Sequence, residues 1–399
     1  MNSMDCKSQI DQFLDLPQQI WLLGAGVSKD AGIPLMIPLT DRVEQMLSGE
    51  NKNIFKSIRS ELPDGSHVEH ILSHLGDFIS LAGRSMSKRV NLGGKDRDRD
   101  TLREVHHLIQ DSIRKTMRFG YIPGNDKNSE KIGTLTDPLV TIDHHVDFVK
   151  ALFQDRRAGL ERRPPVLFFT TNYDTLLEDA LSLCQIPTYD GFSGGTMAFW
   201  APSSIFDTPP DIGSSYQAII QKLHGSIDWF LSKEEIVVRR REGAGYPLEA
   251  GQRLLIYPQA TKYQITQKDP FASIFRDFRS ALMTKESAVL AVCGYSFSDE
   301  HINEEIELAM KHRGNSLTLL AFIRQKNDEI ESAGQGLPSI FVKWLSENDE
   351  DWRERVIVAG SHGVYQGNLN NLLPIDQNSL HAWWSFEGLT HFLKYGPEA

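Results

Sequence analysis

Short apolar runs recur along the chain, and each of four of them ends in small or polar residues. These runs cover residues 20–23, 166–169, 219–223 and 288–293. Continuous apolar runs of this length are typical of strands that are buried on both faces of a parallel sheet. Segments in which apolar residues recur at helical spacing lie between or after these runs, over 173–183, 271–283 and 299–311. Because strands and helices alternate, the pattern predicts an α/β fold with a doubly wound parallel sheet.

Residues from about 40 to 160 interrupt this alternation. Amphipathic helical patterns lie around 68–75 and 102–113, and polar stretches such as 93–100 are expected to be loops between them. We therefore expect a mostly helical insertion after the first strand of a Rossmann-like catalytic domain spanning 1–330. The remaining segment, 331–399, is expected to be a C-terminal extension that packs on the core or serves assembly. It carries Trp344, Trp352, Trp383 and Trp384.

Charge and composition narrow the class of protein. The chain has 399 residues, with 42 Lys and Arg against 53 Asp and Glu, and a net charge of −11. Affinity for phosphate backbones comes largely from Lys and Arg, and this chain has a net negative charge, so direct nucleic-acid binding is not expected. Local basic clusters at 84–103 and 239–241 are typical of solvated faces. No stretch approaches the ~18 apolar residues of a membrane-spanning helix, and the polar N-terminus is unlike a signal peptide, so we expect a soluble cytoplasmic protein.

The residue types that usually bind metals are poorly placed. Cys6, Cys184 and Cys293 lie far apart, without a Cys-x-x-Cys pair. The adjacent histidines at 106–107 and 144–145 would point about 100° apart on a helix, which suits a two-ligand site badly. No metal site is therefore expected.

Candidate chemistry follows the apolar runs. In open α/β sheets ligands gather outside the carboxyl ends of the strands, so residues 24–28, 171–174, 223–226 and 294–296 are expected to line one edge. A glycine turn lets backbone N–H groups approach a diphosphate, although the third glycine of the usual fingerprint is Lys29 here, and glycine turns also serve packing alone. Asn172 suits holding a water or a ribose hydroxyl, and His224 suits accepting a proton. Equally, Asn172 could cap the helix predicted from Tyr173, and His224 could be an ordinary half-buried histidine.

In chain order, GAGVSKDAGIP, TTNYD, LHGS and GYSFSDEHIN resemble the sirtuin-like NAD-binding family, specifically its branch of prokaryotic antiphage effectors. The resemblance covers roughly residues 18–325. It implies that Asn172 and His224 surround the nicotinamide ribose as catalytic residues, with Asp174 where the family motif has an acid. Asp299 could instead cap its helix. The residues that the resemblance implies for NAD binding are Gly24, Ala25, Gly26, Ser28, Thr171, Gly225, Ser226, Gly294, Ser296, Asp299 and Asn303, with His301 in the same turn.

One departure from the family bears on the activity. Sirtuin deacylases carry a four-cysteine zinc module, which three scattered cysteines cannot form, and residues 190–215 are expected to be a loop in its place. The resemblance then implies a metal-free NAD+ hydrolase that releases nicotinamide and ADP-ribose and depletes NAD+ in an abortive antiphage response. Two alternatives stay open: an NAD-dependent protein deacylase or ADP-ribosyltransferase, and a non-catalytic sensor of NAD or ADP-ribose.

An unregulated NAD+ hydrolase would harm its own cell, so the family logic implies a silent state and a trigger. About 70 residues follow the core, too few for the sensing domain of stand-alone members of this branch. We therefore expect regulation by assembly, as a homo-oligomer and with a HerA-type ATPase or another defence-operon partner.

Overall fold

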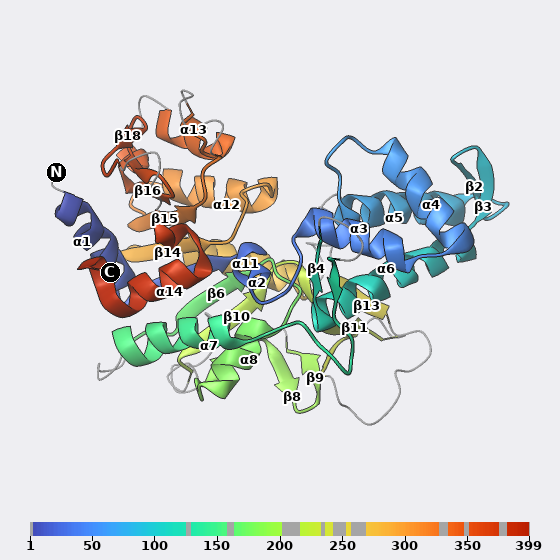
Figure 1. Cartoon of the computed structure of the whole chain (residues 1–399), viewed down its shortest axis with the longest axis horizontal. Coiled ribbons are helices and arrows are strands. Elements are labelled where there is room, and N and C mark those ends of the chain that lie inside the picture. Colours follow the sequence, from blue (N-terminus) through green and yellow to red (C-terminus); the bar gives the residue numbers. More distant parts are fainter. Residues whose placement is uncertain are drawn as a thin grey trace.

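The computed structural model describes residues 3–124, 129–157, 163–201, 216–232, 236–241, 253–256, 269–326, 334–346, 351–374 and 381–398. At its centre lies a nine-stranded sheet in the order β18-β17-β16-β15-β14-β1-β6-β10-β7 (Figure 1). Neighbours from β7 to β16 pair in parallel, and β17 and β18 are antiparallel additions at one edge. The strands are β1 (Gln18–Leu23), β6 (Val166–Thr170), β7 (Thr188–Tyr189), β10 (Ala218–Lys222), β14 (Ala288–Cys293), β15 (Leu317–Ile323), β16 (Val356–Gly360), β17 (Gly363–Gln366) and β18 (Asn370–Asn371).

The strand order reverses at β1. From β1 the chain continues to β6 and β10 on one side, and it later returns to β14, β15 and β16 on the other. This reversal confirms the predicted doubly wound sheet. All four apolar runs form strands of this sheet, with β14 buried along its whole length. The prediction holds because residues covered on both faces of a sheet must be apolar in succession.

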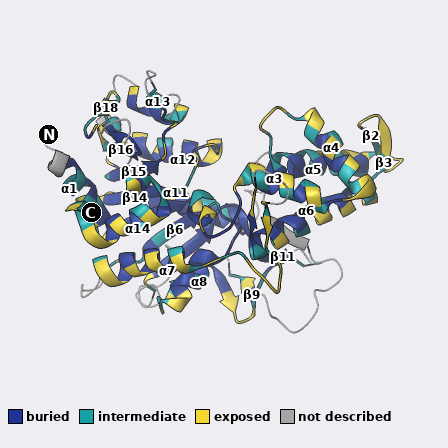
Figure 2. Cartoon of the chain, in the orientation of Figure 1, coloured by how far each residue is buried: buried dark blue, intermediate teal, exposed yellow. Residues whose placement is uncertain are grey.

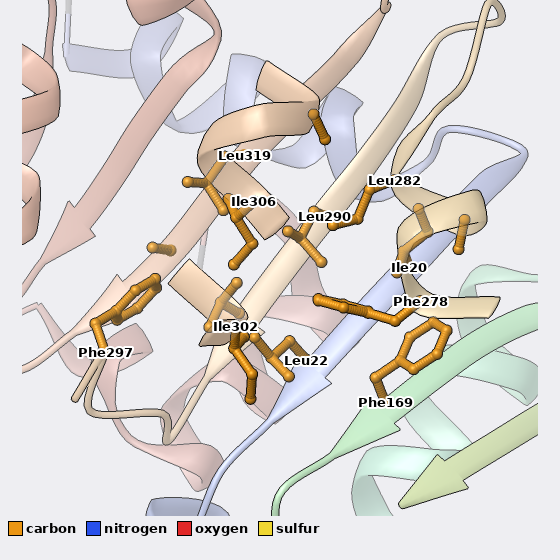
Figure 3. Packing of buried hydrophobic residues seen from close by; sticks show 14 of the residues in the cluster. Ile20, Leu22, Phe169, Phe278, Leu282, Leu290, Phe297, Ile302, Ile306 and Leu319 are labelled. Carbon is orange, nitrogen blue, oxygen red and sulfur yellow. The ribbon is translucent and has the colours of Figure 1, made fainter. Parts of the chain in front are cut away.

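Helices cover both faces of the sheet. On one face α11 (Phe271–Leu282) and α12 (Glu300–Lys311) pack on the strands, with α13 (Ser339–Ser346) beyond them. Figure 3 shows Phe278 and Leu282 of α11, and Ile302 and Ile306 of α12, against strand residues such as Leu290. The opposite face is covered by α1 (Ser3–Leu14), α7 (Asp143–Lys150), the π-helical turn η1 (Ala151–Arg156), α8 (Leu176–Leu183) and α14 (Phe386–Tyr395).

After β1 and the short α2 (Gly26–Lys29), the chain leaves the sheet for a largely helical region that extends to one end of the molecule (Figure 1). This region, here called the helical insertion, contains α3 (Met36–Met46), α4 (Gly49–Glu61), α5 (Val68–Arg84) and α6 (Arg99–Phe119), the hairpin of β2 (Arg89–Leu92) and β3 (Lys95–Asp98), and the pair β4 (Tyr121–Ile122) and β5 (Lys131–Ile132). It buries its own apolar cluster. The loop expected at 93–100 is wrong: Gly93 and Gly94, at φ 57° and 75°, turn the β2–β3 hairpin, and Asp98 caps α6.

A second sheet lies beside the first, in the order β13-β11-β12-β9-β8. Its strands are β8 (Phe192–Gly194), β9 (Met197–Trp200), β11 (Gly225–Leu231), β12 (Val237–Arg240) and β13 (Arg253–Ile256). The loop expected over 190–215 is therefore wrong for β8 and β9, whereas 202–215 lie outside the described residues. The aromatic rings of Phe192, Trp200 and Trp229 bring these short strands together, with the Phe192 centroid 5.0 Å from that of Trp229.

The C-terminal segment continues the main sheet. It supplies β16 to β18 and the helices α13 and α14, with the short 3₁₀ turns η4 (Asp351–Arg355), η5 (Ala382–Trp384) and η6 (Gly396–Glu398). Trp344 and Trp352 are buried on one face of the sheet and Trp383 on the other. Figure 2 shows the strands and the inner faces of the helices buried, with exposed residues along the outer faces. None of the helices described is long and apolar enough to cross a membrane.

Candidate active site

The four motifs meet at the carboxyl edge of the main sheet. Leu23 at the end of β1 is the register partner of both Thr170 and Cys293, and Thr170 is also the partner of Lys222. Backbone hydrogen bonds continue past the strand ends, from Thr171 N to Leu23 O (3.1 Å) and from Leu223 N to Thr170 O (2.8 Å). The turns that carry the predicted residues therefore start at one level on adjacent strands, as expected.

The glycine turn after β1 packs directly against the turn after β14. Gly24 N donates to Cys293 O (3.0 Å), and Gly26 N donates to Gly294 O (2.9 Å). A Cβ at Gly24 would lie 2.5 Å from Gly294 O, and one at Gly26 would lie 2.7 Å from Gly294 Cα. The close approach of the two backbones is therefore enough to explain both glycines, and no ligand is needed to account for them. Gly294 has φ +67°, which glycine adopts without strain.

Asn172 has one end of its amide satisfied and the other free. Its Nδ2 donates to Ser28 Oγ (3.1 Å), and its backbone N donates to Thr170 Oγ1 (3.0 Å). Its Oδ1 is buried without a hydrogen-bond partner in the described structure. Since buried polar atoms are nearly always paired, this oxygen suits a hydroxyl or water donor that the chain itself does not supply. Ser28, fully buried, orients the amide.

His224 forms a buried pair with Asp299. The His224 Nε2 and the Asp299 Oδ2 are 2.9 Å apart, and both residues are nearly inaccessible to solvent. A carboxylate at Nε2 places the proton of the neutral ring there, so Nδ1 carries the lone pair that can accept a proton. Asp299 also caps α12, because its Oδ1 accepts from His301 N (3.1 Å). The capping role considered for Asp299 is therefore present, together with a bond to His224 that the sequence did not indicate.

The turn after β14 is held by hydrogen bonds within itself. Asn303 Nδ2 donates to Phe297 O (2.8 Å), and Tyr295 OH donates to Asp299 O (3.3 Å). Burial, with the nearby Asp299 charge, raises the pKa of Tyr295 far above its ordinary value, so its hydroxyl stays protonated. Asn303 thus shapes the turn, whereas Ser296 and His301 are the exposed residues among those predicted for this motif.

Asp174 bonds the first residue of α8. Its Oδ1 accepts from Leu176 N (3.1 Å), while Thr175 is the N-cap residue. The helix begins at Leu176 rather than at the predicted Tyr173, so Asn172 does not cap it. The Asp174 backbone carbonyl accepts from Lys222 Nζ. Lys222 also pairs with Glu178 Oε1 at 3.0 Å. Burial raises the pKa of Glu178, against the lowering effect of the Lys222 charge.

The turn after β10 is fastened to Tyr173. Gly225 has φ +87°, and the chain turns there from β10 into β11. Ser226 Oγ donates to Tyr173 O (3.3 Å), and Ile227 N donates to the same carbonyl (2.9 Å). Thr171 is half-buried at the start of the neighbouring turn. The Asn172 and His224 turns are thus bonded to each other as well as to their strands.

Sequence reasoning missed three residues that hold these turns. They are Glu69, whose Oε1 accepts from Tyr173 OH, Tyr173 itself, and Lys222. For Lys222 a signal was present, because a lysine within a buried strand needs a buried partner. For Glu69 there was none, because 104 residues separate it from Tyr173.

Three arginines of the basic clusters pair with the protein's own carboxylates. Arg239 pairs with Asp190 and lies over the Phe192 ring, 5.3 Å from its centroid. Arg241 pairs with Asp228 at 3.4 Å, and Arg97 pairs with Glu50. In the part of the chain that the structure describes, no group of three His, Cys, Asp or Glu side chains could hold a metal ion.

Comparison with known proteins gives two findings. Residues 166–344, from β6 into α13, match the model of the family described as SIR2-like domain. Among solved structures the chain is similar to a Sir2 histidine-to-tyrosine mutant with a p53 peptide and NAD. The identity is 13%, the TM-score is 0.35, and the match covers 82% of this chain and 90% of that one. A comparison with curated proteins finds no match.

Proposed function

We propose that this protein hydrolyses NAD+ to nicotinamide and ADP-ribose at the edge formed by Asn172 and His224. The observation that carries the proposal is the Asn172 amide, whose buried oxygen has no partner among the described residues while its nitrogen is held by Ser28. His224, on the adjacent turn, forms a buried pair with Asp299 from the start of α12. The SIR2-like match over 166–344, which includes both turns, supports NAD as the substrate.

Hydrolysis of NAD+ needs a base and a group that positions the nucleophile. His224 can act as the base and Asn172 as the positioning group. Attack of water on the ribose carbon forms a C–O bond and breaks the bond to nicotinamide. The nitrogen keeps the bonding electron pair, so the cationic pyridinium leaves as neutral nicotinamide and needs no general acid. The proton lost by water passes to His224 Nδ1, and Asp299 at Nε2 offsets the positive charge. Asn172 Oδ1 holds the water or a ribose hydroxyl without adding charge.

The remaining predicted residues would hold the rest of the substrate. In the glycine turn, the N–H groups of Gly24, Gly26, Val27 and Ser28 already donate to backbone carbonyls. We therefore propose that this turn contributes shape and the Ala25 N–H rather than a row of free donors. Thr171, Gly225 and Ser226 border the nicotinamide ribose in this proposal, and Ser296 faces the adenosine half.

The biological role and the partners are proposed from the motif resemblance. NAD+ depletion would act as an abortive response to phage infection in the cytoplasm. The activity would be controlled by assembly into a homo-oligomer and with a HerA-type ATPase or another defence-operon partner. The helical insertion and the segment 331–399 are the surfaces that we propose for these contacts.

The direct test measures products from NAD+ with and without an acetyl-lysine peptide. Wild-type protein, alone or with the neighbouring operon product, is expected to release nicotinamide and ADP-ribose in equal amounts, independent of peptide. His224→Ala is expected to lower the rate by about 10²–10⁴-fold, the usual contribution of a positioned base. Reaction in ¹⁸O-water should place the label on the ribose carbon of ADP-ribose.

Each alternative has its own outcome. Nicotinamide release that requires the peptide, with the acyl group transferred, would indicate a deacylase. ADP-ribose that appears on protein would indicate a transferase. Binding of NAD without turnover in every assembly state would indicate a sensor, and the hydrolase proposal would be wrong.

A further inference from the structure

Tyr173 lies between Asn172 and Asp174 and connects three parts of the molecule. Its hydroxyl donates to Glu69 Oε1 on α5 of the helical insertion. Its backbone carbonyl accepts from Ser226 Oγ (3.3 Å) and Ile227 N (2.9 Å), two and three residues after His224. Displacement of Tyr173 must therefore disturb the Asn172 turn directly and the His224 turn through that carbonyl.

The Tyr173 contact is buried and polar. Tyr173 and Glu69 are both nearly inaccessible to solvent, and the Tyr173 ring packs in the apolar cluster of the helical insertion. Burial raises the pKa of Tyr173 well above its ordinary value, and the charges of Glu69 and Asp299 act in the same direction. The hydroxyl therefore stays protonated and donates, with Glu69 as the acceptor. A buried carboxylate that loses its hydrogen-bond donor costs free energy, so Glu69 favours the position of Tyr173 in which the hydroxyl reaches it.

Apolar contacts at the same place belong to the same two turns. Leu176 follows the Asn172 turn, Ile227 follows the His224 turn, and Phe230 lies further along β11. All three are buried in the cluster of the helical insertion rather than in the two clusters on the faces of the main sheet. Movement of the helical insertion would thus act on both turns. The Tyr173–Glu69 hydrogen bond joins the insertion to the Asn172 turn.

We infer that Glu69 is a positioning residue, through which the helical insertion sets the Asn172 turn by its bond to Tyr173. Glu69 acts on the reaction only through Tyr173. The inference rests on the proposed function for its activity readout, but not for its structural readout.

The test compares four single variants with wild type. Glu69→Ala removes the acceptor, Tyr173→Phe removes only the hydroxyl, and Glu69→Gln keeps an acceptor oxygen. The matched control is Glu44→Gln, because Glu44 belongs to the same insertion and pairs with Arg59 (2.8 Å) on α4, not with the site. The readouts are kcat and KM for nicotinamide release, thermal unfolding, and hydrogen exchange of the Ile227 amide, which donates to Tyr173 O.

Glu69→Ala and Tyr173→Phe are expected to lower kcat about tenfold or more while KM changes less than about twofold, since positioning acts in the transition state. Both should speed exchange at Ile227 by about tenfold, because its carbonyl partner becomes loosely held. Glu69→Gln should restore most of the activity, and Glu44→Gln should match wild type. A uniform loss that follows only the fall in unfolding temperature, in all four variants, would overturn the inference.

The two proposals fail in different ways. If wild type never releases nicotinamide, yet Ile227 exchanges faster in Glu69→Ala and Tyr173→Phe alone, the positioning holds and the proposed hydrolysis is wrong. If wild type hydrolyses NAD+ while kcat and Ile227 exchange stay unchanged in both variants, the positioning is wrong and the hydrolysis stands. Tyr173→Phe keeps the test decisive if Glu69→Ala does not fold, because it deletes one oxygen and retains the packed ring.

Discussion

Two buried amides lie in equivalent places, each two residues beyond a parallel strand of the main sheet, and the fold treats them differently. Gln325 follows β15, and both ends of its amide are used: Oε1 accepts from His362 N (2.7 Å), and Nε2 donates to Tyr365 OH (2.9 Å) and Gln335 O (2.6 Å). Asn172 follows β6, and no residue that the structure describes bonds its Oδ1. The amide of Gln325 is thus fully hydrogen-bonded within the described structure, whereas the amide of Asn172 keeps one acceptor for another molecule.

The difference separates a residue that builds the fold from one that suits a ligand. At Gln325 the chain returns through β16 and β17, and the amide is held by His362 between these strands, by Tyr365 of β17 and by Gln335 ahead of α13. At Asn172 the neighbouring turn brings His224, whose ring is held by Asp299. An unpaired buried acceptor beside an oriented base is a costly arrangement for a purely structural site. We therefore expect substitutions at the two amides to have opposite effects.

The largest effect is expected from Asn172→Ala on the rate. Nicotinamide release should fall by about 10²-fold or more, since the group that positions the nucleophile is lost. Unfolding in urea should show a loss of only about 1 kcal/mol, because one hydrogen bond, to Ser28, disappears. If the rate stays within twofold of wild type, the contrast with Gln325 has no functional meaning.

The next largest effect is expected from Gln325→Ala on stability. The substitution removes the hydrogen bonds that Gln325 makes to His362, Tyr365 and Gln335. A loss of about 3 kcal/mol in the free energy of unfolding is expected in urea titrations. The rate of nicotinamide release, measured where the variant is fully folded, should remain within about twofold of wild type. A stable but inactive Gln325→Ala would place this amide in the site and break the comparison.

A smaller effect is expected from His145, on the pH dependence of the free energy of unfolding. This residue tests whether every unpaired buried polar atom indicates a ligand site. Its Nδ1 is also without a partner in the described structure, and burial lowers its pKa to about 4, with the His144 charge in the same direction and the Asp174 charge opposing. The unfolded chain binds the proton at a pKa of about 6.5. Stability is therefore full above that value and falls as the pH drops towards 4, by about 2 kcal/mol between pH 7 and pH 5.

His145→Phe should remove this pH dependence, because no proton is then bound on unfolding. The replacement ring can keep the contact with Phe386, whose centroid lies 5.1 Å from that of His145. Urea unfolding at pH 7 and pH 5 measures the effect, and nicotinamide release should be unchanged. Loss of activity here would mean that an unpaired atom alone, without the His224–Asp299 pair beside it, is enough to indicate function.

The sequence predicted the main elements of the sheet and the helices around it well, because their burial is local and periodic. It failed over β8 and β9, where strands of three and four residues depend on Trp229 from another part of the chain. It also failed at 93–100, where charged residues form a hairpin that is not buried enough to show an apolar pattern. Short strands and exposed hairpins are stabilised by partners that a local pattern does not contain.

The sequence by itself determined which strands are buried, where they end, and therefore that Asn172 and His224 share one edge of a parallel sheet. Only the tertiary structure decided what each of these residues touches. Asp299 reaches His224 across 75 positions, and Glu69 reaches Tyr173 across 104. The reason is physical: burial leaves a periodic record along the chain, whereas a hydrogen bond between two distant side chains is specified by the packing of the elements that carry them.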